Sequence, residues 1–386
     1  MTPQRLFPDI PAGYCDEAKA IPAFWLTTPE EVDTFLRDQV RLGVVETIAI
    51  SPGGRPVKSV SYGRPRAPGG TTTFSGTLGT RDQDIRCYRG PDAGKAVFVA
   101  VAAVHGGELE TIVGALNLIA VFETGRDLSG QAWPALVALR DQVDRIVSVP
   151  LGNPDGRARF PVRMEPYRGG ELDSYFVHEY LNTGGHKDGS LIGWPAVKEF
   201  IPMDFRQFAF PGGYPNDAGV NLMHDDFMGQ PQPETRALLD LVAREKPDLI
   251  LNMHTGVAKN DYYMEVHRPF AEPGMSPVFD AFYRRVKTRL TLEGLQGSRD
   301  PAVSSNPARV ASFAYNLNTA LNLHSGGLCV TIESPCHGYS GTNAAGEPAV
   351  HAPADLLRTQ LIAYEESLAF LRDTGGRVRW NNIFPV

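Results

Sequence analysis

Short apolar runs that alternate with helical segments constrain the fold of this chain most strongly. The apolar runs cover residues 96–104, 145–150, 248–253 and 328–332. Helical patterns lie between or after them, near residues 108–123, 233–245, 277–291 and 354–372. Strands without polar alternation, separated by helices, are typical of a parallel sheet that is covered on both faces. The sequence therefore predicts an α/β/α sandwich with a mixed, mostly parallel central sheet.

Two clear local patterns precede these runs. The stretch TTPEEVDTFLRDQVRLG predicts a helix that Thr28 caps, that Pro29 and Glu31 begin, and that Gly43 ends. The stretch VETIAISPGGRPVKSVSYG predicts a hairpin around the turn at residues 51–54. This hairpin would add antiparallel strands at one edge of the sheet.

The domain organisation is expected to be simple. A chain of 386 residues can bury a large core as one α/β domain. Residues 157–219 hold many Gly, Pro, Tyr and Phe residues and no clear element. Loops of this length are more often functional than mere connectors. We expect one catalytic domain over residues 1–386, with a loop-rich insertion at about 157–219 over one face.

Composition and charge exclude several classes of partner. The chain is 42% apolar and 21% charged, with a net charge of −7 and no lysine/arginine run, which gives no reason to expect nucleic acid. No apolar segment approaches the ~18 residues of a membrane span, and no signal-peptide pattern opens the chain. The four cysteines are scattered, which favours free thiols and a cytoplasmic location. The oligomeric state stays open, with a homo-oligomer as one alternative.

Polar side chains follow each of the four apolar runs. His105 and Glu108 follow the first run, Asn153 the second, His254 the third and Glu333 the fourth. The carboxyl ends of parallel strands meet at one edge of a sheet, and ligands bind outside that edge. Each residue alone is more simply a polar strand end or part of a turn. Their coincidence at four strand ends favours a constructed site.

The residue types in this set suit a catalytic metal. Two histidines and one glutamate are an established ligand set for zinc, which keeps one position open for water. His105 and Glu108 share a face at a spacing of three residues, and His254 would supply the third ligand. Glu333 remains as general base and, later, as acid for the leaving group. The sequence thus predicts one zinc per chain and hydrolysis of an acyl bond, although the same ligands also suit other first-row metals.

These residues, in this order, resemble the zinc carboxypeptidase family over roughly residues 28 to 373. His105 and Glu108 match the family's H-x-x-E motif, residues 153–156 match its N-P-D-G, and His254 and Glu333 match its later histidine and catalytic glutamate. The stretch AISPGGRPVKSVSYG is similar to the family's early hairpin, which favours the peptidase branch over the aspartoacylase-like deacylases. The resemblance implies a carboxypeptidase-like fold and a zinc-dependent hydrolase with Glu333 as general base.

The chain departs from the family where the substrate's terminal carboxylate would bind. The family's G-V-D-x-N-R-N-F reads GVNLMHDDF here. Asn221 replaces the aspartate that would orient the first zinc histidine, and Met223 and His224 replace the Asn-Arg pair. Methionine donates no hydrogen bond and histidine is no bidentate fork, so the usual clamp is not expected. His224 remains a candidate donor, more strongly so if protonated.

The resemblance also implies other substrate contacts at less specific positions. Counting along the chain assigns the arginine that polarises the carbonyl to Arg168, with Arg163 as the alternative. The candidates for the remaining substrate contacts are Asn153, Tyr315 and His324.

Three functions follow from these predictions. The first is a metallocarboxypeptidase-type hydrolase of peptides. The second is an amidohydrolase or deacylase that cleaves a small-molecule amide or an N-acyl amino acid, because the clamp is missing. The third is a non-catalytic binding module, against which the intact ligand set and Glu333 argue.

Overall fold

The computed structural model describes residues 3–78, 84–168, 172–255, 263–269, 272–297, 315–338, 340–342, 345 and 347–384. At the centre of the described structure lies a sheet of seven strands in the order β1-β2-β4-β3-β7-β9-β8. The pairs β4/β3, β3/β7 and β7/β9 are parallel, whereas β1/β2, β2/β4 and β8/β9 are antiparallel. The strands are β1 (Val44–Ile50), β2 (Pro56–Gly63), β3 (Val97–Ala102), β4 (Arg145–Val149), β7 (Leu249–Thr255), β8 (Glu265–His267) and β9 (Leu328–Ser334). The mixed sheet and its antiparallel hairpin edge are as predicted.

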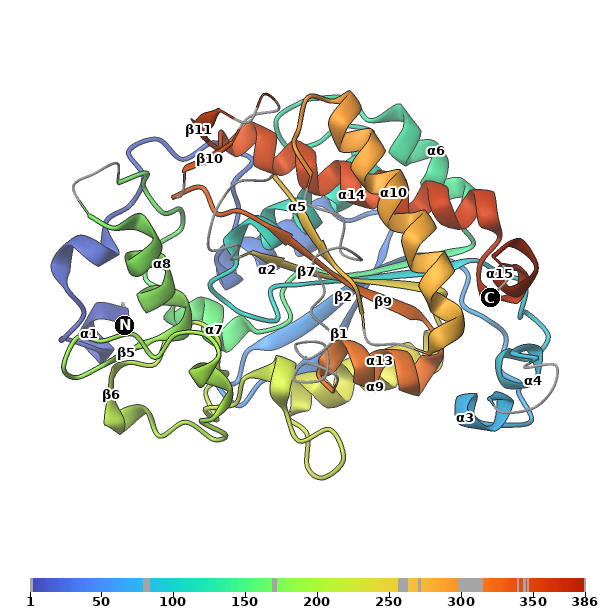
Figure 1. Ribbon diagram of the computed structural model, residues 1–386, viewed down its shortest axis with the longest axis horizontal. Coiled ribbons are helices and arrows are strands. Elements are labelled where there is room, and N and C mark those ends of the chain that lie inside the picture. The colour runs from blue at the N-terminus through green and yellow to red at the C-terminus, as the bar shows by residue number, and fades with distance from the viewer. Residues whose placement is uncertain are drawn as a thin grey trace.

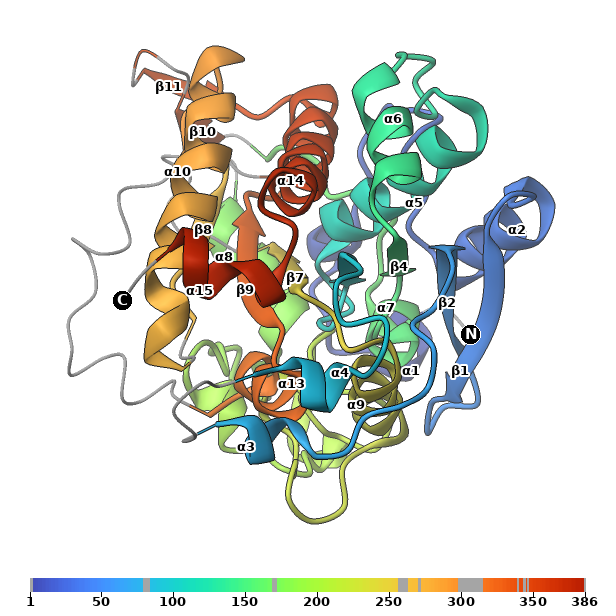
Figure 2. The same cartoon turned by 90° about the vertical axis from the view of Figure 1, so that its right-hand side faces the viewer.

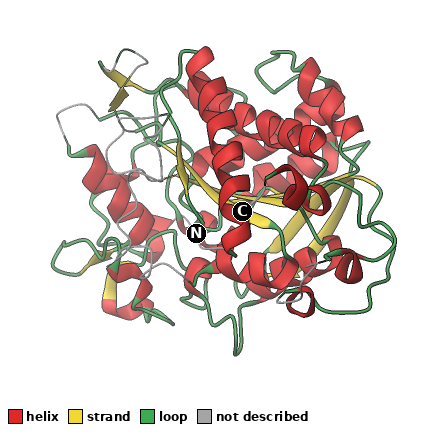
Figure 3. Ribbon diagram, turned by 45° about the vertical axis from the view of Figure 1, so that its right-hand side comes forward, coloured by secondary structure: helices red, strands yellow, loops and turns green. Residues whose placement is uncertain are grey.

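Helices cover both faces of this sheet (Figures 1, 2 and 3). One face packs against α5 (Leu109–Thr124), α6 (Pro134–Gln142), α10 (Ser276–Leu292) and α14 (Pro353–Thr374), and the other against α9 (Pro233–Glu245) and α13 (Leu317–Ser325). Successive residues of β3 point to opposite faces, so Phe98 joins the first core and Val99 the second. Because both faces are buried, β3 needs apolar residues at every position, as its sequence has.

The remaining helices and strands lie around this sandwich. They are α1 (Pro3–Leu6), α2 (Pro29–Gln39), α3 (Phe74–Thr77), α4 (Arg86–Arg89), α7 (Pro154–Arg159), α15 (Arg377–Ile383), the 3₁₀ turns η1 (Ala12–Cys15), η2 (Ala196–Lys198), η3 (Phe205–Gln207), η4 (Leu222–His224) and η5 (Pro273–Met275), and the pair β10 (Ser340–Thr342) and β11 (Pro348–Val350). Thr28 and Glu31 form the predicted capping box of α2. The helix ends at Gln39, before the predicted Gly43, because Val40 already has an extended backbone.

Residues 157–219 contain more regular structure than the sequence indicated. They include α8 (Ser174–Thr183) and the short antiparallel pair β5 (Gly185–His186) and β6 (Phe208–Phe210). Asp173 caps α8 by accepting hydrogen bonds from the backbone of Tyr175 and Phe176. The expectation of a segment without elements was therefore wrong, and Asp173 was the overlooked signal for a helix start. In Figure 1, α8, β5 and β6 lie together to the left of the sheet.

The sequence predicted neither disulfides nor membrane-spanning helices. All four cysteines are described, and none of them forms a disulfide. Among the residues that the structure describes, every helix lacks the length or the hydrophobicity that crossing a membrane requires.

Candidate metal centre

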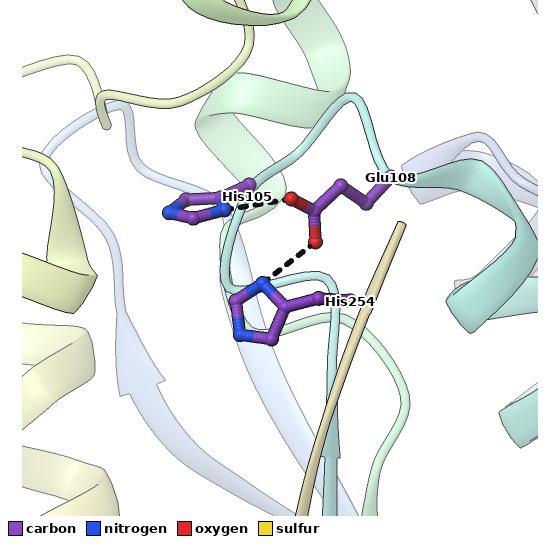
Figure 4. Close-up of side chains that lie close together, drawn as sticks. All are labelled: His105, Glu108 and His254. Atoms are coloured by element: carbon purple, nitrogen blue, oxygen red, sulfur yellow. Dashed lines mark hydrogen bonds and ion pairs between the residues drawn. The ribbon is translucent and has the colours of Figure 1, made fainter. Parts of the chain in front are cut away.

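Three buried side chains converge at the carboxyl edge of the sheet. His105 and Glu108 lie in the turn between β3 and α5, and His254 lies near the end of the neighbouring strand β7 (Figure 4). Each is at most 3% exposed, and one potential ligand atom from each lies within 4.8 Å of the others. The Nδ1 atoms of the two histidines approach the two oxygens of Glu108, at 2.7 Å from His105 and 2.9 Å from His254. The structure therefore brings the three predicted ligands together.

The turn that carries His105 and Glu108 is too tightly packed for side chains at its two glycines. A Cβ atom on Gly106 would lie 2.0 Å from the backbone nitrogen of Arg157, and one on Gly107 would lie 2.7 Å from the ring of Phe160. Ala103, just after β3, has a positive φ of 51°, which is uncommon for a residue with a side chain. The strained, glycine-rich backbone lets the chain leave the strand abruptly and pack the turn that carries both ligands against α7.

The hydrogen bonds around His105 leave a lone pair that faces Glu108. Asn221 Oδ1 accepts the backbone N–H of Met223 at 3.1 Å, which fixes the orientation of the amide. The same oxygen lies 3.1 Å from His105 Nε2, so Nε2 carries a proton and donates it. In neutral His105, Nδ1 then holds a lone pair 2.7 Å from Glu108 Oε1. Two acceptors this close need a cation or a further proton between them, which fits a metal ligand pair.

Burial and charge act in opposite directions on the three ligands. Burial lowers the pKa of His105. Burial also disfavours charge on Glu108 and His254, but their attraction outweighs it, so the pKa of Glu108 falls to about 2 and that of His254 rises. His254 Nε2 is buried without a hydrogen-bond partner. The carboxylate and two imidazoles are the donor set that zinc prefers, and these residues fit that ion.

Two further carboxylates face this centre. Glu333 lies on β9 directly beside His254 in the β7/β9 register, and its carboxyl is 3.7 Å from His267 Nε2. Burial raises the pKa of Glu333, and that of Glu179 on α8 is also raised by burial. The charge of Glu108 acts on both. The sequence predicted Glu333 here but gave no sign of Glu179, because α8 itself was not recognised.

Tyr214 is a second neighbour that the sequence did not reveal. Its ring stacks on the His105 imidazole with centroids 3.6 Å apart and an interplanar angle of 7°. Burial raises the pKa of its phenol well above the usual range, so the hydroxyl stays protonated. Tyr214 therefore holds the His105 ring in place and offers a neutral donor beside the centre.

The early hairpin is tied to the first turn of α7. Asp155 is fully buried and accepts hydrogen bonds from Ser51 Oγ at 2.6 Å and from the Gly53 backbone at 2.9 Å. Arg55 completes the contact with an ion pair to Asp155 at 2.8 Å. These contacts explain why the two motifs occur together: the hairpin turn supports α7, against which the metal-binding turn packs.

Asn153 and His224 lie near the centre in different roles. Asn153 is 0% exposed, and its amide caps α7 and donates to the Tyr214 carbonyl at 2.8 Å, which leaves it little freedom to contact a substrate. The His224 ring lies tilted at 46° to that of Trp194, with centroids 5.7 Å apart, and burial together with Lys198, His105 and His254 lowers its pKa to about 3. A neutral His224 cannot replace the charge of an arginine clamp.

The structure shows which groups the two predicted arginines contact. Arg168 donates to the carbonyls of Gly13 and Tyr14, and Arg163 pairs with Glu31. Both arginines are thus engaged with the N-terminal segment, and their role toward a substrate stays a prediction.

Tyr315 precedes α13, and His324 lies in the last turn of that helix. Tyr315 is 45% exposed and packs edge-on against Phe227. His324 lies at the end of α13 that leads into β9, whereas Glu333 lies near the far end of that strand. A seven-residue strand is about 20 Å long, so His324 lies at the opposite edge of the sheet from the metal ligands.

Comparison with known proteins identifies the fold. No family model and no curated protein sequence matches the chain. Among solved structures, a metallo-carboxypeptidase from Pseudomonas aeruginosa, in complex with (2-guanidinoethylmercapto)succinic acid, matches 89% of this chain and 68% of its own, with 14% identity and a TM-score of 0.53. A metallo-carboxypeptidase from Burkholderia cenocepacia covers the same shares, with 17% identity and a TM-score of 0.50.

A third structure, from Burkholderia mallei and provisionally named a carboxypeptidase, matches with 16% identity and a TM-score of 0.56 over 89% of this chain and 68% of its own. The chain therefore has the fold of the metallocarboxypeptidases, as its motifs predicted.

Proposed function

We propose that this protein is a zinc-dependent hydrolase that cleaves an amide bond, with one catalytic zinc held by His105, Glu108 and His254. The observation that carries the proposal is the approach of their ligand atoms to within 4.8 Å in a buried position. Their place at the carboxyl edge of a metallocarboxypeptidase-like sheet supports it. Charged groups are rarely gathered in a core unless they are paired or bind an ion.

Glu333 is the proposed general base. A zinc ion bound at this centre would polarise the scissile carbonyl and make water acidic enough to react near neutral pH. Glu333 accepts a proton from the attacking water and then donates it to the departing nitrogen. Its place beside His254 in the strand register and its raised pKa support a group that both takes up and releases a proton. Tyr214, protonated and stacked on His105, is a further donor for the polarised oxygen.

The substrate carboxylate is the point at which two functions diverge. Met223 and the neutral His224 supply no cation, which favours a small-molecule amide or N-acyl amino acid over a peptide with a free C-terminus. In favour of the peptide, Lys198 acts electrostatically on His224, and its Nζ lies 5.3 Å from the Trp194 ring. Lys198 could therefore bind the carboxylate that an arginine binds in the family.

The test begins with metal content and a panel of substrates. About one zinc at this centre, with hydrolysis that chelator abolishes and zinc restores, is expected. A peptide is then compared with its C-terminal amide. Equal rates favour the small-amide function. A strong preference for the peptide with a free carboxylate favours the peptidase, provided that Lys198→Met abolishes this preference. A protein that binds metal but hydrolyses no member of the panel would favour the binding module.

A further inference from the structure

A second buried cluster of potential metal ligands lies outside the proposed catalytic centre. Glu165 follows α7, His178 lies on α8, and Cys336 follows β9. They are 4%, 1% and 1% exposed, and one ligand atom from each lies within 4.8 Å of the others. Two neighbouring segments and one that is distant in the sequence thus bring a carboxylate, an imidazole and a thiol into one enclosed place.

The contacts within this cluster match those of the first. His178 Nδ1 lies 2.6 Å from Glu165 Oε2, compared with 2.7 Å between the corresponding atoms of His105 and Glu108. Cys336 interacts with both His178 and Glu165 through its side chain. The Cys336 sulfur completes a mixed donor set that is typical of protein-bound zinc.

The amide of Asn182, which is 0% exposed, supplies an independent indication of an ion. Its Oδ1 is buried without a partner, while its Nδ2 lies 3.5 Å from His178 Nε2. The two ends of an amide are assigned from their contacts, and turning this one by half a turn lets Oδ1 accept a hydrogen bond from Nε2–H. Metal-binding histidines usually donate their second N–H in this way. The Nδ1 lone pair of His178 would then face Glu165, as the Nδ1 of His105 faces Glu108.

The charges of these ligands can also balance those of a divalent ion. Binding would displace the thiol proton of Cys336 to solvent, so that a thiolate and the Glu165 carboxylate neutralise the two positive charges of the ion. Glu110 on α5 is 3% exposed, accepts the backbone N–H of His337 at 2.7 Å, and is affected by the charge of Glu165. Glu110 therefore lies beside the cluster.

We propose that Glu165, His178 and Cys336 form a second, structural zinc site beside the catalytic one. The ion would join α8 to the segment that follows β9 and to the loop after α7. It thereby fixes two elements that carry residues of the catalytic centre, Glu179 on α8 and Glu333 on β9. The site binds zinc without touching the substrate, because its ligands are fully enclosed.

Cobalt(II) provides a direct test, since only the second site contains sulfur. The metal-free protein is titrated with cobalt, and the sulfur-to-cobalt charge-transfer band is recorded in wild type, Cys336→Ser, His254→Ala and Cys87→Ser. Cys87 is the exposed thiol and controls for adventitious binding. We expect the band in wild type, His254→Ala and Cys87→Ser, and its loss in Cys336→Ser. Zinc content should fall from about two ions per chain to about one in Cys336→Ser and in His254→Ala.

The wild-type titration decides the matter even if Cys336→Ser does not fold. A saturated wild-type protein without a sulfur band would show that Glu165, His178 and Cys336 form only a hydrogen-bonded cluster, and would overturn the proposal. Loss of the band in Cys87→Ser would overturn it as well, because the exposed thiol would then be the ligand. Failure of the catalytic proposal has a different signature: His254→Ala would keep all the metal of wild type.

Discussion

Replacing Glu333 by glutamine is the sharpest test of the proposed chemistry. Glutamine keeps the size of the side chain but cannot take up the proton of the attacking water. General acid–base catalysis is worth about 10²–10⁴-fold, so kcat/KM should fall by that factor, which corresponds to about 3–5 kcal/mol in the barrier. Metal content should not change, because Glu333 is not among the three convergent ligands.

The structure indicates that this loss would not reflect unfolding. Among the residues that the structure describes, the Glu333 carboxyl pairs with His267 alone, at 3.7 Å, and the two side chains are 24% and 47% exposed. Ion pairs of this kind contribute about 0–1 kcal/mol to stability. The expected effect on the barrier is several times larger, so activity and the unfolding midpoint separate the two explanations.

Glu179→Gln is the matched control. The charge of Glu108 acts on Glu179 as it does on Glu333, and the pKa of Glu179 is also raised. Replacing Glu179 therefore alters the electrostatic potential at the metal centre without removing the proposed base. We expect less than about a tenfold loss in that variant. Both variants are assayed with zinc restored, on the best substrate of the panel. If Glu333→Gln stayed nearly as active as wild type while Glu179→Gln lost the larger factor, Glu179 would be the base and our assignment would be refuted.

Three further predictions concern the metal and the core. His254→Ala should lose the catalytic metal, whereas His324→Ala, at the opposite sheet edge, should retain it; elemental analysis of both distinguishes a ligand from a general effect of losing a histidine. Asn221→Ala should weaken zinc binding by about 10–100-fold, because His105 Nε2–H loses the Asn221 oxygen as its acceptor, and equal affinity in a competition assay with a chelator would contradict this. Burial raises the pKa of Glu234 from 4.5 to about 7, so the folded state holds this proton more tightly than the unfolded state, and the resulting stability is lost as pH rises from about 4.5 to 7. Glu234→Gln should therefore match wild type in urea unfolding at pH 4 and exceed it by about 3 kcal/mol at pH 8; equal differences at both pH values would disprove the buried, protonated carboxyl.

The strands and ligands of the centre were predictable because their signals are local. Continuous apolar runs marked β3, β4, β7 and β9, and a parallel sheet can bring the residues after those runs to one edge only. His105, Glu108, His254 and Glu333 follow from that rule without any knowledge of side-chain contacts.

The walls of the site were not predictable in the same way. Tyr214 stacks on His105, and the charge of Glu108 acts on Glu179. Both interactions join segments that are separated by many residues. Arg168 and Arg163 were assigned by counting along a loop whose length differs from that of the family. The contacts of both with the N-terminal segment depend on the path of that loop, which no local pattern determines.

The separation of the three ligands along the chain has a consequence for how the protein matures. His105 and Glu108 are near neighbours, but His254 joins them only after β7 has paired with β3. The unfolded polypeptide would thus offer zinc only two of the three proposed ligands close together, and would bind it weakly. The complete ligand set exists only in the folded tertiary structure. An ion that recognises the native state alone raises its resistance to heat with every increase in free zinc. Cellular metal supply would then influence the lifetime of this protein as well as its activity.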